Sequence, residues 1–298
     1  MSIAIDINNL TKQYVETAAI KNMTISLEKD KIYGLIGRNG AGKTTLLHML
    51  AGHILPTEGN ITIFNQPIYE NKMALDQICF TAIFNSPSFA RYAVSFRVKD
   101  IINTAANFYP NWDQDFANQL INEFGLSPKK KLKDLSTGMV SMVSVVVGLA
   151  SRASVTLLDE PYTGLDASAR HLFYDILAED YGKHPRTIIF STHLIDEASR
   201  LFENVILIDQ GSLVFNLPIE HIEEMSYLIH GSTDILETTV RNKRIVHKES
   251  LGNNSSIAVF DSITSEELTS YKHAGLNIQN LSLQKLFVYL TALNRRAI

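Results

Sequence analysis

One segment of eight residues constrains the fold of this chain more than any other, namely Gly37–Thr44. It matches the pattern G-x-x-x-x-G-K-S/T, which joins a strand to a helix. The apolar run Ile32–Ile36 before it predicts the strand, and apolar residues at helical spacing after it, such as Leu46 and Leu50, predict the helix. Because glycine lacks a Cβ, the backbone N–H groups of such a loop can turn inward around phosphate oxygens. The segment therefore predicts a phosphate-binding loop, with the N-terminus of the helix facing the anion.

The same loop supplies the side chains that a nucleoside triphosphate needs. Lys43 brings a positive charge to the β- and γ-phosphates, and the hydroxyl of Thr44 is a typical Mg²⁺ ligand at this position. We expect every residue of the loop, and the residue after it, to bind the nucleotide: Gly37, Arg38, Asn39, Gly40, Ala41, Gly42, Lys43, Thr44 and Thr45.

A second apolar run ends in two adjacent carboxylates. Val155–Leu158 is typical of a buried strand, and Asp159 and Glu160 follow it directly. Open α/β sheets bind ligands at the carboxyl ends of their strands, so both side chains can reach the nucleotide. We predict that Asp159 holds Mg²⁺ and that Glu160 activates the attacking water.

Further elements follow in an order that belongs to one superfamily: Tyr14, Leu135–Met139, Tyr162–Asp166 and Ser191–His193. With the two features above, they make the chain resemble the ATPase subunits of ABC transporters over nearly its whole length. The resemblance implies that the nucleotide is ATP, that Tyr14 stacks on adenine, and that His193 is catalytic beside Glu160 through a γ-phosphate contact. It also places Asp166 in a loop that contacts the nucleotide site.

The resemblance further implies a composite site made by two subunits. Leu135–Met139 stands where the family has its Leu-Ser-Gly-Gly-Gln signature, so Ser136 and Gly138 would present a hydroxyl and backbone N–H groups at a helix N-terminus. In the family this helix faces the γ-phosphate held by a second ATPase subunit. Closure of the two subunits on ATP then drives a separate transmembrane permease.

Three positions depart from the family pattern. The signature has Thr137 and Met139 in place of a glycine and the glutamine, and the glutamine expected after Ile78–Phe80 is missing. In that region Asn85 offers the only amide, which we predict as a replacement ligand for Mg²⁺ and the nucleotide. These departures leave open whether the second ATPase subunit is an identical or a related chain.

The order of elements predicts an α/β fold. Strands alternating with helices through residues 1–217 indicate a P-loop ATPase core, with a β-subdomain and a helical signature subdomain at about 94–150. After Pro218 the pattern changes to short strands and helices, which predicts a small C-terminal α+β domain over 218–298.

Composition agrees with a globular protein that reaches a membrane only through a partner. The chain has 298 residues with 45% hydrophobic and 19% charged, and its net charge of −4 favours neither nucleic acid nor anionic lipid. Cys79 alone cannot form an intrachain disulfide. With no leader or spanning segment evident, we expect a cytoplasmic protein held at the inner face of the cell membrane by its permease.

Two alternatives to a transport ATPase stay open, a soluble ABC-type ATPase acting elsewhere and a regulatory nucleotide-binding module. Asn107–Asp113, the signature and the tail Leu283–Leu290 resemble ATPase subunits of small Gram-positive exporters, a group that includes phenol-soluble modulin exporters. The resemblance implies an exporter of peptides or amphipathic compounds, while the sequence does not name the substrate.

Overall fold

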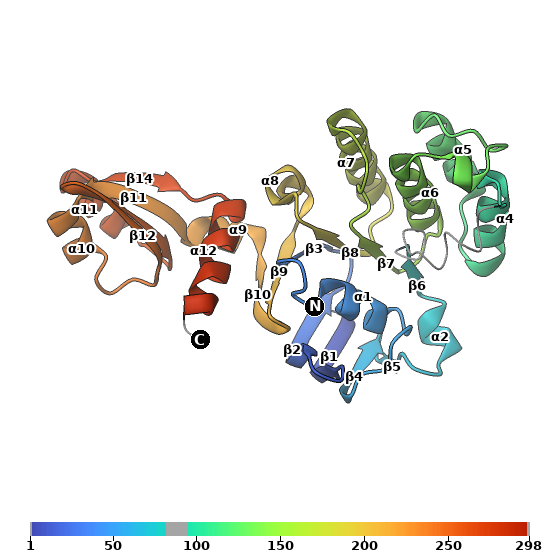
Figure 1. Ribbon diagram of the computed structural model, residues 1–298, viewed down its shortest axis with the longest axis horizontal. Helices are drawn as coiled ribbons and strands as arrows, with labels where there is room; N and C mark the ends of the chain where they lie inside the picture. Colours follow the sequence, from blue (N-terminus) through green and yellow to red (C-terminus); the bar gives the residue numbers. More distant parts are fainter. Residues whose placement is uncertain (1, 82–94, 297–298) are drawn as a thin grey trace.

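The computed structural model describes residues 2–81 and 95–296. Figure 1 shows an elongated molecule with the C-terminal region at one end and a group of helices at the other. The longest sheet has five parallel strands and one antiparallel edge strand, in the order β10 (Ser212–Pro218), β9 (Asn204–Asp209), β3 (Ile32–Ile36), β8 (Thr187–Thr192), β7 (Val155–Asp159) and β6 (Ile78–Phe80).

The two faces of this sheet pack into different cores, because alternate residues of a strand point to opposite sides. Tyr33 and Leu35 join a cluster with the second sheet and with α1 (Lys43–Leu50). That sheet is antiparallel, in the order β2 (Ala18–Glu28), β1 (Ile3–Gln13), β4 (Glu58–Ile63) and β5 (Gln66–Pro67), and the short α2 (Lys72–Leu75) follows it.

Ile32 and Ile36 point to the other face, which is covered by helices. These are α4 (Val98–Phe108), α5 (Gln114–Glu123), α6 (Thr137–Ala150), α7 (Ala167–Lys183) and α8 (Ile195–Ala198), with 3₁₀ turns at Leu132–Asp134 and Ser199–Leu201. Helices α4, α5 and α6 gather at one end of the molecule (Figure 1).

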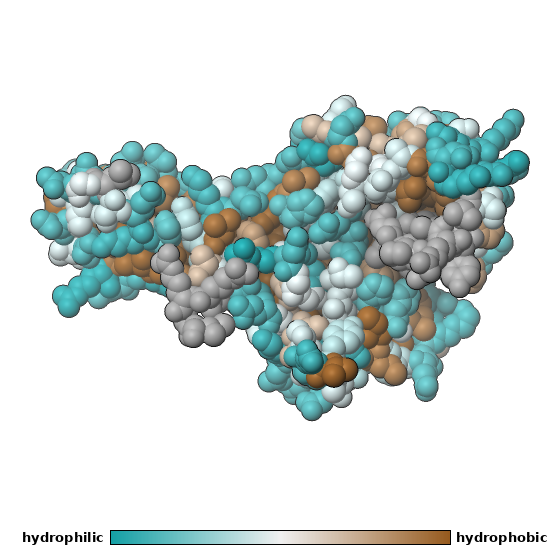
Figure 2. Space-filling view, in the orientation of Figure 1, coloured by the Kyte–Doolittle hydropathy of each residue, from teal (hydrophilic) through white to brown (hydrophobic). Residues whose placement is uncertain are grey.

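The C-terminal region has its own antiparallel sheet, in the order β12 (Ile245–Leu251), β13 (Asn254–Phe260), β11 (Ser226–Ser232) and β14 (Asn277–Asn280). One face packs against α10 (Thr233–Thr239) and α11 (Ser265–His273). Phe260 and Leu286 instead join the cluster that holds Ile32 and Ile36, so this region and the central sheet share one core. Helices α9 (Ile219–Met225) and α12 (Leu283–Arg296) lie at the junction (Figure 1), where the molecule narrows (Figure 2).

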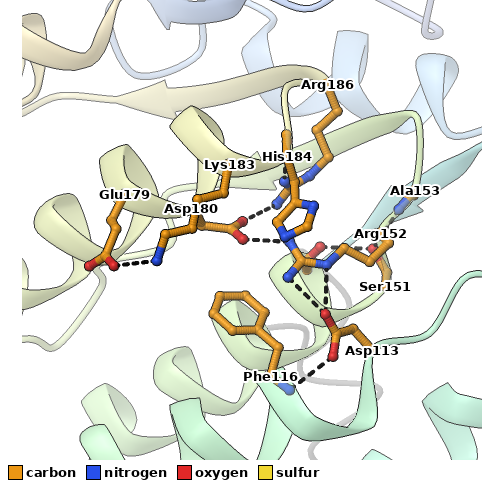
Figure 3. Close-up of polar contacts among 11 residues, drawn as sticks. Asp113, Phe116, Ser151, Arg152, Ala153, Glu179, Asp180, Lys183, His184 and Arg186 are labelled. Atoms are coloured by element: carbon orange, nitrogen blue, oxygen red, sulfur yellow. Dashed lines mark hydrogen bonds and ion pairs between the residues drawn. The ribbon is translucent and has the colours of Figure 1, made fainter.

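A network of ion pairs lies at the amino-terminal edge of the central sheet (Figure 3). The buried carboxylate of Asp180 on α7 contacts Arg152 and accepts a bond of 2.7 Å from Arg186, which stands just before β8. Arg152 stands just before β7 and also contacts Asp113, the N-cap of α5, at 2.9 Å. The network therefore ties α5 and α7 to two neighbouring strands.

The predicted α/β class is confirmed, and several strands and helices go beyond what the sequence patterns indicated. Ala19–Ile20 and Thr24–Leu27 belong to one strand, because β2 continues through irregular pairing with β1 at the positive φ of Asn22. Residues 58–60 pair with β1 as the start of β4. Strand β10 and helix α10 were not predicted at all.

Candidate functional site

Three adjacent strands bring the predicted chemistry to one edge of the central sheet. Strand β8 lies between β3 and β7, with Ile36 paired to Thr192 and Asp159 paired to Ser191. The loop after β3, the carboxylates after β7 and His193 after β8 therefore emerge side by side, at the carboxyl ends where α/β sheets bind ligands.

The predicted phosphate-binding loop has the backbone that such a role requires. Gly40 and Gly42 adopt φ values of 80° and 109°, a region that favours glycine. Helix α1 begins at Lys43 with Gly42 as N-cap, and no side chain caps its first N–H groups. These donors are free to bind an anion.

Lys43 lies at the bottom of this site. Its side chain is buried, and its Nζ donates to the carbonyl oxygens of Gly37 at 2.7 Å and Arg38 at 3.3 Å. Burial lowers the pKa of Lys43, and the carboxylates of Glu160 and Asp159 partly offset this. The two acidic residues are therefore near enough to act on the lysine electrostatically.

Ser191 binds the carboxylate of Asp159 and the backbone of Glu160. Its Oγ donates to Asp159 Oδ1 at 2.6 Å and accepts from the backbone N–H of Glu160 at 2.9 Å. Glu160 adopts a positive φ of 46°, and its carbonyl accepts from the N–H and the hydroxyl of Thr163. This tight turn points the strand end toward His193, whose Nδ1 lies 3.6 Å from Glu160 Oε1.

The signature segment caps a helix, as predicted, and packs closely against the loop after Glu160. Ser136 is the N-cap of α6, and its Oγ accepts from the N–H of Met139 at 3.2 Å. A Cβ on Gly138 would lie 2.4 Å from the carbonyl oxygen of Gly164, so only glycine fits there. The buried Ser141 adds a hydrogen bond of 2.7 Å from its Oγ to the carbonyl of Thr163.

The remaining predicted residues vary in exposure. Asp166 is the N-cap of α7 and accepts from the N–H of Ala169 at 2.8 Å. Tyr14 is 45% exposed in the turn after β1, with Lys12 Nζ 5.3 Å from its ring centre. Asn85 lies outside the described residues. Exposed or half-exposed loop residues are Arg38, Asn39, Gly40, Gly42, Thr44 and Thr45.

Two contributors to the site were not predicted. Ser191 and Tyr162 belong to the family-like segments Ser191–His193 and Tyr162–Asp166, but neither was predicted to have a role. The available signal was a hydroxyl at the end of a strand that neighbours an acidic strand end. In the described part of the chain, no three His, Cys, Asp or Glu side chains cluster to hold a metal ion. That finding is compatible with Mg²⁺, which is bound through one or two carboxylates together with phosphates and water.

Comparison with known proteins decides the family. A family model described as ABC transporter matches residues 20–163. The bacitracin transport ATP-binding protein BcrA of Bacillus licheniformis is 30% identical over 297 residues, which cover 97% of this chain and 90% of that protein. The chain belongs to the ABC transporter ATP-binding family. The ABC transporter ATP-binding protein YtrB of Bacillus subtilis (strain 168) is 27% identical over 220 residues, 74% of each chain.

Solved ABC cassettes have the same fold. A structure described as the ATP binding subunit of an ABC transporter matches with a TM-score of 0.64 at 22% identity, over 74% of this chain and 92% of that one. As an ABC ATPase, the chain binds and hydrolyses ATP for a transport system. Within residues 2–81 and 95–296, no helix is both long and apolar enough to span a bilayer.

Proposed function

We propose that this chain drives a separate permease by hydrolysing Mg²⁺-ATP between two ATPase subunits. One observation carries the proposal. The uncapped start of α1, the carboxylates of β7 and the histidine of β8 emerge from three adjacent strands at one edge of the sheet. A cationic, donor-rich loop beside two carboxylates suits phosphoryl transfer to water, because it binds the phosphates and offers a base to the attacking water.

Each residue then has a role. The loop of residues 37–45 binds the phosphates, with the positive charge of Lys43 on the β- and γ-phosphates. Glu160 accepts the proton of the attacking water, and His193 contacts the γ-phosphate. Thr44, Asp159 and Asn85 would hold Mg²⁺, which neutralises phosphate charge when bound. Tyr14 would stack on adenine with its exposed ring.

A second ATPase subunit completes the site. Ser136, Gly138 and Asp166 lie at two helix N-termini joined by the close contact between Gly138 and Gly164, which suits them to meet a partner's nucleotide together. The altered signature residues Thr137 and Met139 favour pairing with a related chain that carries a stronger signature, while an identical chain remains the alternative.

The transported compound would be a peptide or another amphipathic molecule leaving the cell. Relatives named for bacitracin transport and, in Rhizobium meliloti and Burkholderia, for Nod factor export support this proposal. The chain would lie on the inner face of the membrane, bound to its permease. Residues 218–298 would form an accessory domain, a proposal supported by their separate sheet and by a similarity to BcrA that covers 97% of this chain.

The substitution Glu160→Gln tests this function. It keeps the shape of the side chain and removes the base, so we expect ATP binding near wild type, hydrolysis reduced by about 10²–10⁴-fold, and a dimer trapped by ATP. Turnover and size-exclusion chromatography with Mg²⁺-ATP measure these effects, with Glu123→Gln at the exposed end of α5 as the control. Unchanged turnover together with a monomer in ATP would reject the role of Glu160.

A further inference from the structure

Tyr162 is buried beside the site, and its hydroxyl lies among three polar groups. The side chain is only 2% exposed. Its oxygen lies 2.8 Å from Thr192 Oγ1 and accepts a hydrogen bond from the backbone N–H of His193 at 2.8 Å. The Nδ1 of His193 lies 3.3 Å from the same oxygen. The two rings also meet edge to face, with centroids 5.4 Å apart.

We propose that Tyr162 is a positioning residue that fixes the backbone and the imidazole of His193 for its contact with the γ-phosphate. The inference rests on the proposed role of His193. It concerns Tyr162 alone, whose hydrogen bonds among the described residues reach neither the loop of residues 37–45 nor a carboxylate.

The hydrogen bond to the backbone fixes the position of the main chain at His193. Among the described residues the N–H of His193 has no other hydrogen-bond acceptor, because β8 ends at Thr192 and the ladder with β3 stops there. Thr192 Oγ1 meanwhile accepts from the N–H of Leu194 at 2.9 Å. One phenol and one hydroxyl thus bind the two N–H groups that leave the strand, and they hold the chain in a single path around the histidine.

The contact with the imidazole determines which ring nitrogen of His193 carries the proton. A phenol carries a single proton, so it donates either to Thr192 Oγ1 or to Nδ1 of His193. When it donates to Nδ1, the proton of the neutral ring stands on Nε2, the nitrogen turned away from Tyr162. This arrangement supplies a donor for a phosphate oxygen.

Glu160 competes for the same nitrogen. Its Oε1 lies 3.6 Å from Nδ1, against 3.3 Å for the phenol oxygen. Without the phenol, the carboxylate of Glu160 would be the remaining polar partner of Nδ1 within the described structure, and that pairing would occupy both the proposed base and the histidine. Tyr162 therefore keeps the two groups available for separate tasks.

The substitution Tyr162→Phe tests the inference, because it removes the hydroxyl and keeps the ring. We expect kcat for ATP to fall about tenfold, since small misplacements at a reacting centre have effects of this size, with KM changed less than about twofold. The matched control is Tyr174→Phe, which removes a buried hydroxyl that has no hydrogen-bond partner in the described structure.

A double-mutant cycle separates positioning from a general loss of structure. If Tyr162 acts through His193, Tyr162→Phe added to His193→Ala lowers single-turnover hydrolysis no further. An equal loss in both backgrounds would mean a structural role and overturn the inference. If Tyr162→Phe has wild-type kcat while His193→Ala is impaired, the proposed role of Tyr162 is overturned and that of His193 stands. Wild-type turnover in His193→Ala would reject the proposed role of His193 as well.

Discussion

The two edges of the central sheet use the same kinds of charged residue in opposite ways. At the carboxyl edge, Lys43 and Asp159 form no ion pair with any described side chain, and Lys43 donates to backbone carbonyls instead. At the amino edge, Arg152 and Arg186 both pair with the buried carboxylate of Asp180 in the network of Figure 3.

The charged residues at the carboxyl edge remain available to bind a ligand, whereas those at the amino edge stabilise the fold. A buried charge is costly unless it is paired, so the lysine in the loop persists only because carbonyls and nearby carboxylates support it until phosphates bind. Charges in the amino-edge network already have their partners. Substitutions at the two edges should therefore affect different measurements.

The largest effect is expected at the carboxyl edge. Lys43→Ala should lower ATP turnover by at least about 10²–10³-fold, because it removes the charge that binds the phosphates and stabilises the transition state. Without nucleotide, this substitution should lower the free energy of unfolding far less than a substitution of Asp180, because removing Lys43 leaves no buried ion-pair partner without its counter-charge. Turnover and urea unfolding measure the two effects, and wild-type hydrolysis would reject the loop assignment.

The next effect is on stability at the amino edge. Asp180→Asn leaves Arg186 facing an amide in a buried site, which should cost about 3–5 kcal/mol of unfolding free energy. Turnover per folded molecule should stay near wild type. Glu179→Gln is the control on the same helix, because its pair with Lys183 is exposed and should contribute little. Equal losses in the two variants would contradict the contrast between the edges.

The smallest effect concerns Asp113 and depends on pH. Burial raises the pKa of Asp113, but the N–H of Phe116 and the guanidinium of Arg152 more than offset this, and the net pKa is lowered. A lowered carboxyl pKa stabilises the fold above the unfolded value of about 4, and the stabilisation is lost as pH falls through the folded pKa.

Asp113→Asn keeps a good N-cap residue and removes only the charge. The partly exposed pair should contribute about 0.5–1 kcal/mol at pH 7. Urea unfolding of both proteins from pH 7 to pH 3 should show this difference shrink below about pH 4. A difference that grows with acid would contradict the assignment.

Local patterns predicted the carboxyl edge well and the amino edge poorly. The loop of residues 37–44 and the acidic end of β7 are each encoded in a few consecutive residues, and parallel strands bring them together. The partners of Arg152 stand 39 and 28 residues away along the chain, so no local pattern joins them. For the same reason, the hydroxyl of Tyr162 gave no signal of its contact with His193.

Gly138 shows that a glycine singled out for one role can be required by the fold for another. It was predicted to offer an N–H group to phosphate, yet the structure explains the glycine by its contact with Gly164, 26 positions further along the chain. Only the folded backbone reveals that contact.

That contact has a mechanical consequence. There is no room for a side chain between Gly138 and Gly164, and Ser141 is hydrogen-bonded to the carbonyl of Thr163. The N-terminal ends of α6 and α7 therefore form one rigid unit. Under the proposed function, Ser136 and Asp166 would approach a partner in step and leave it in step. Neither glycine can gain a methyl group unless the other backbone retreats, so we expect substitutions at the two positions to be strongly non-additive.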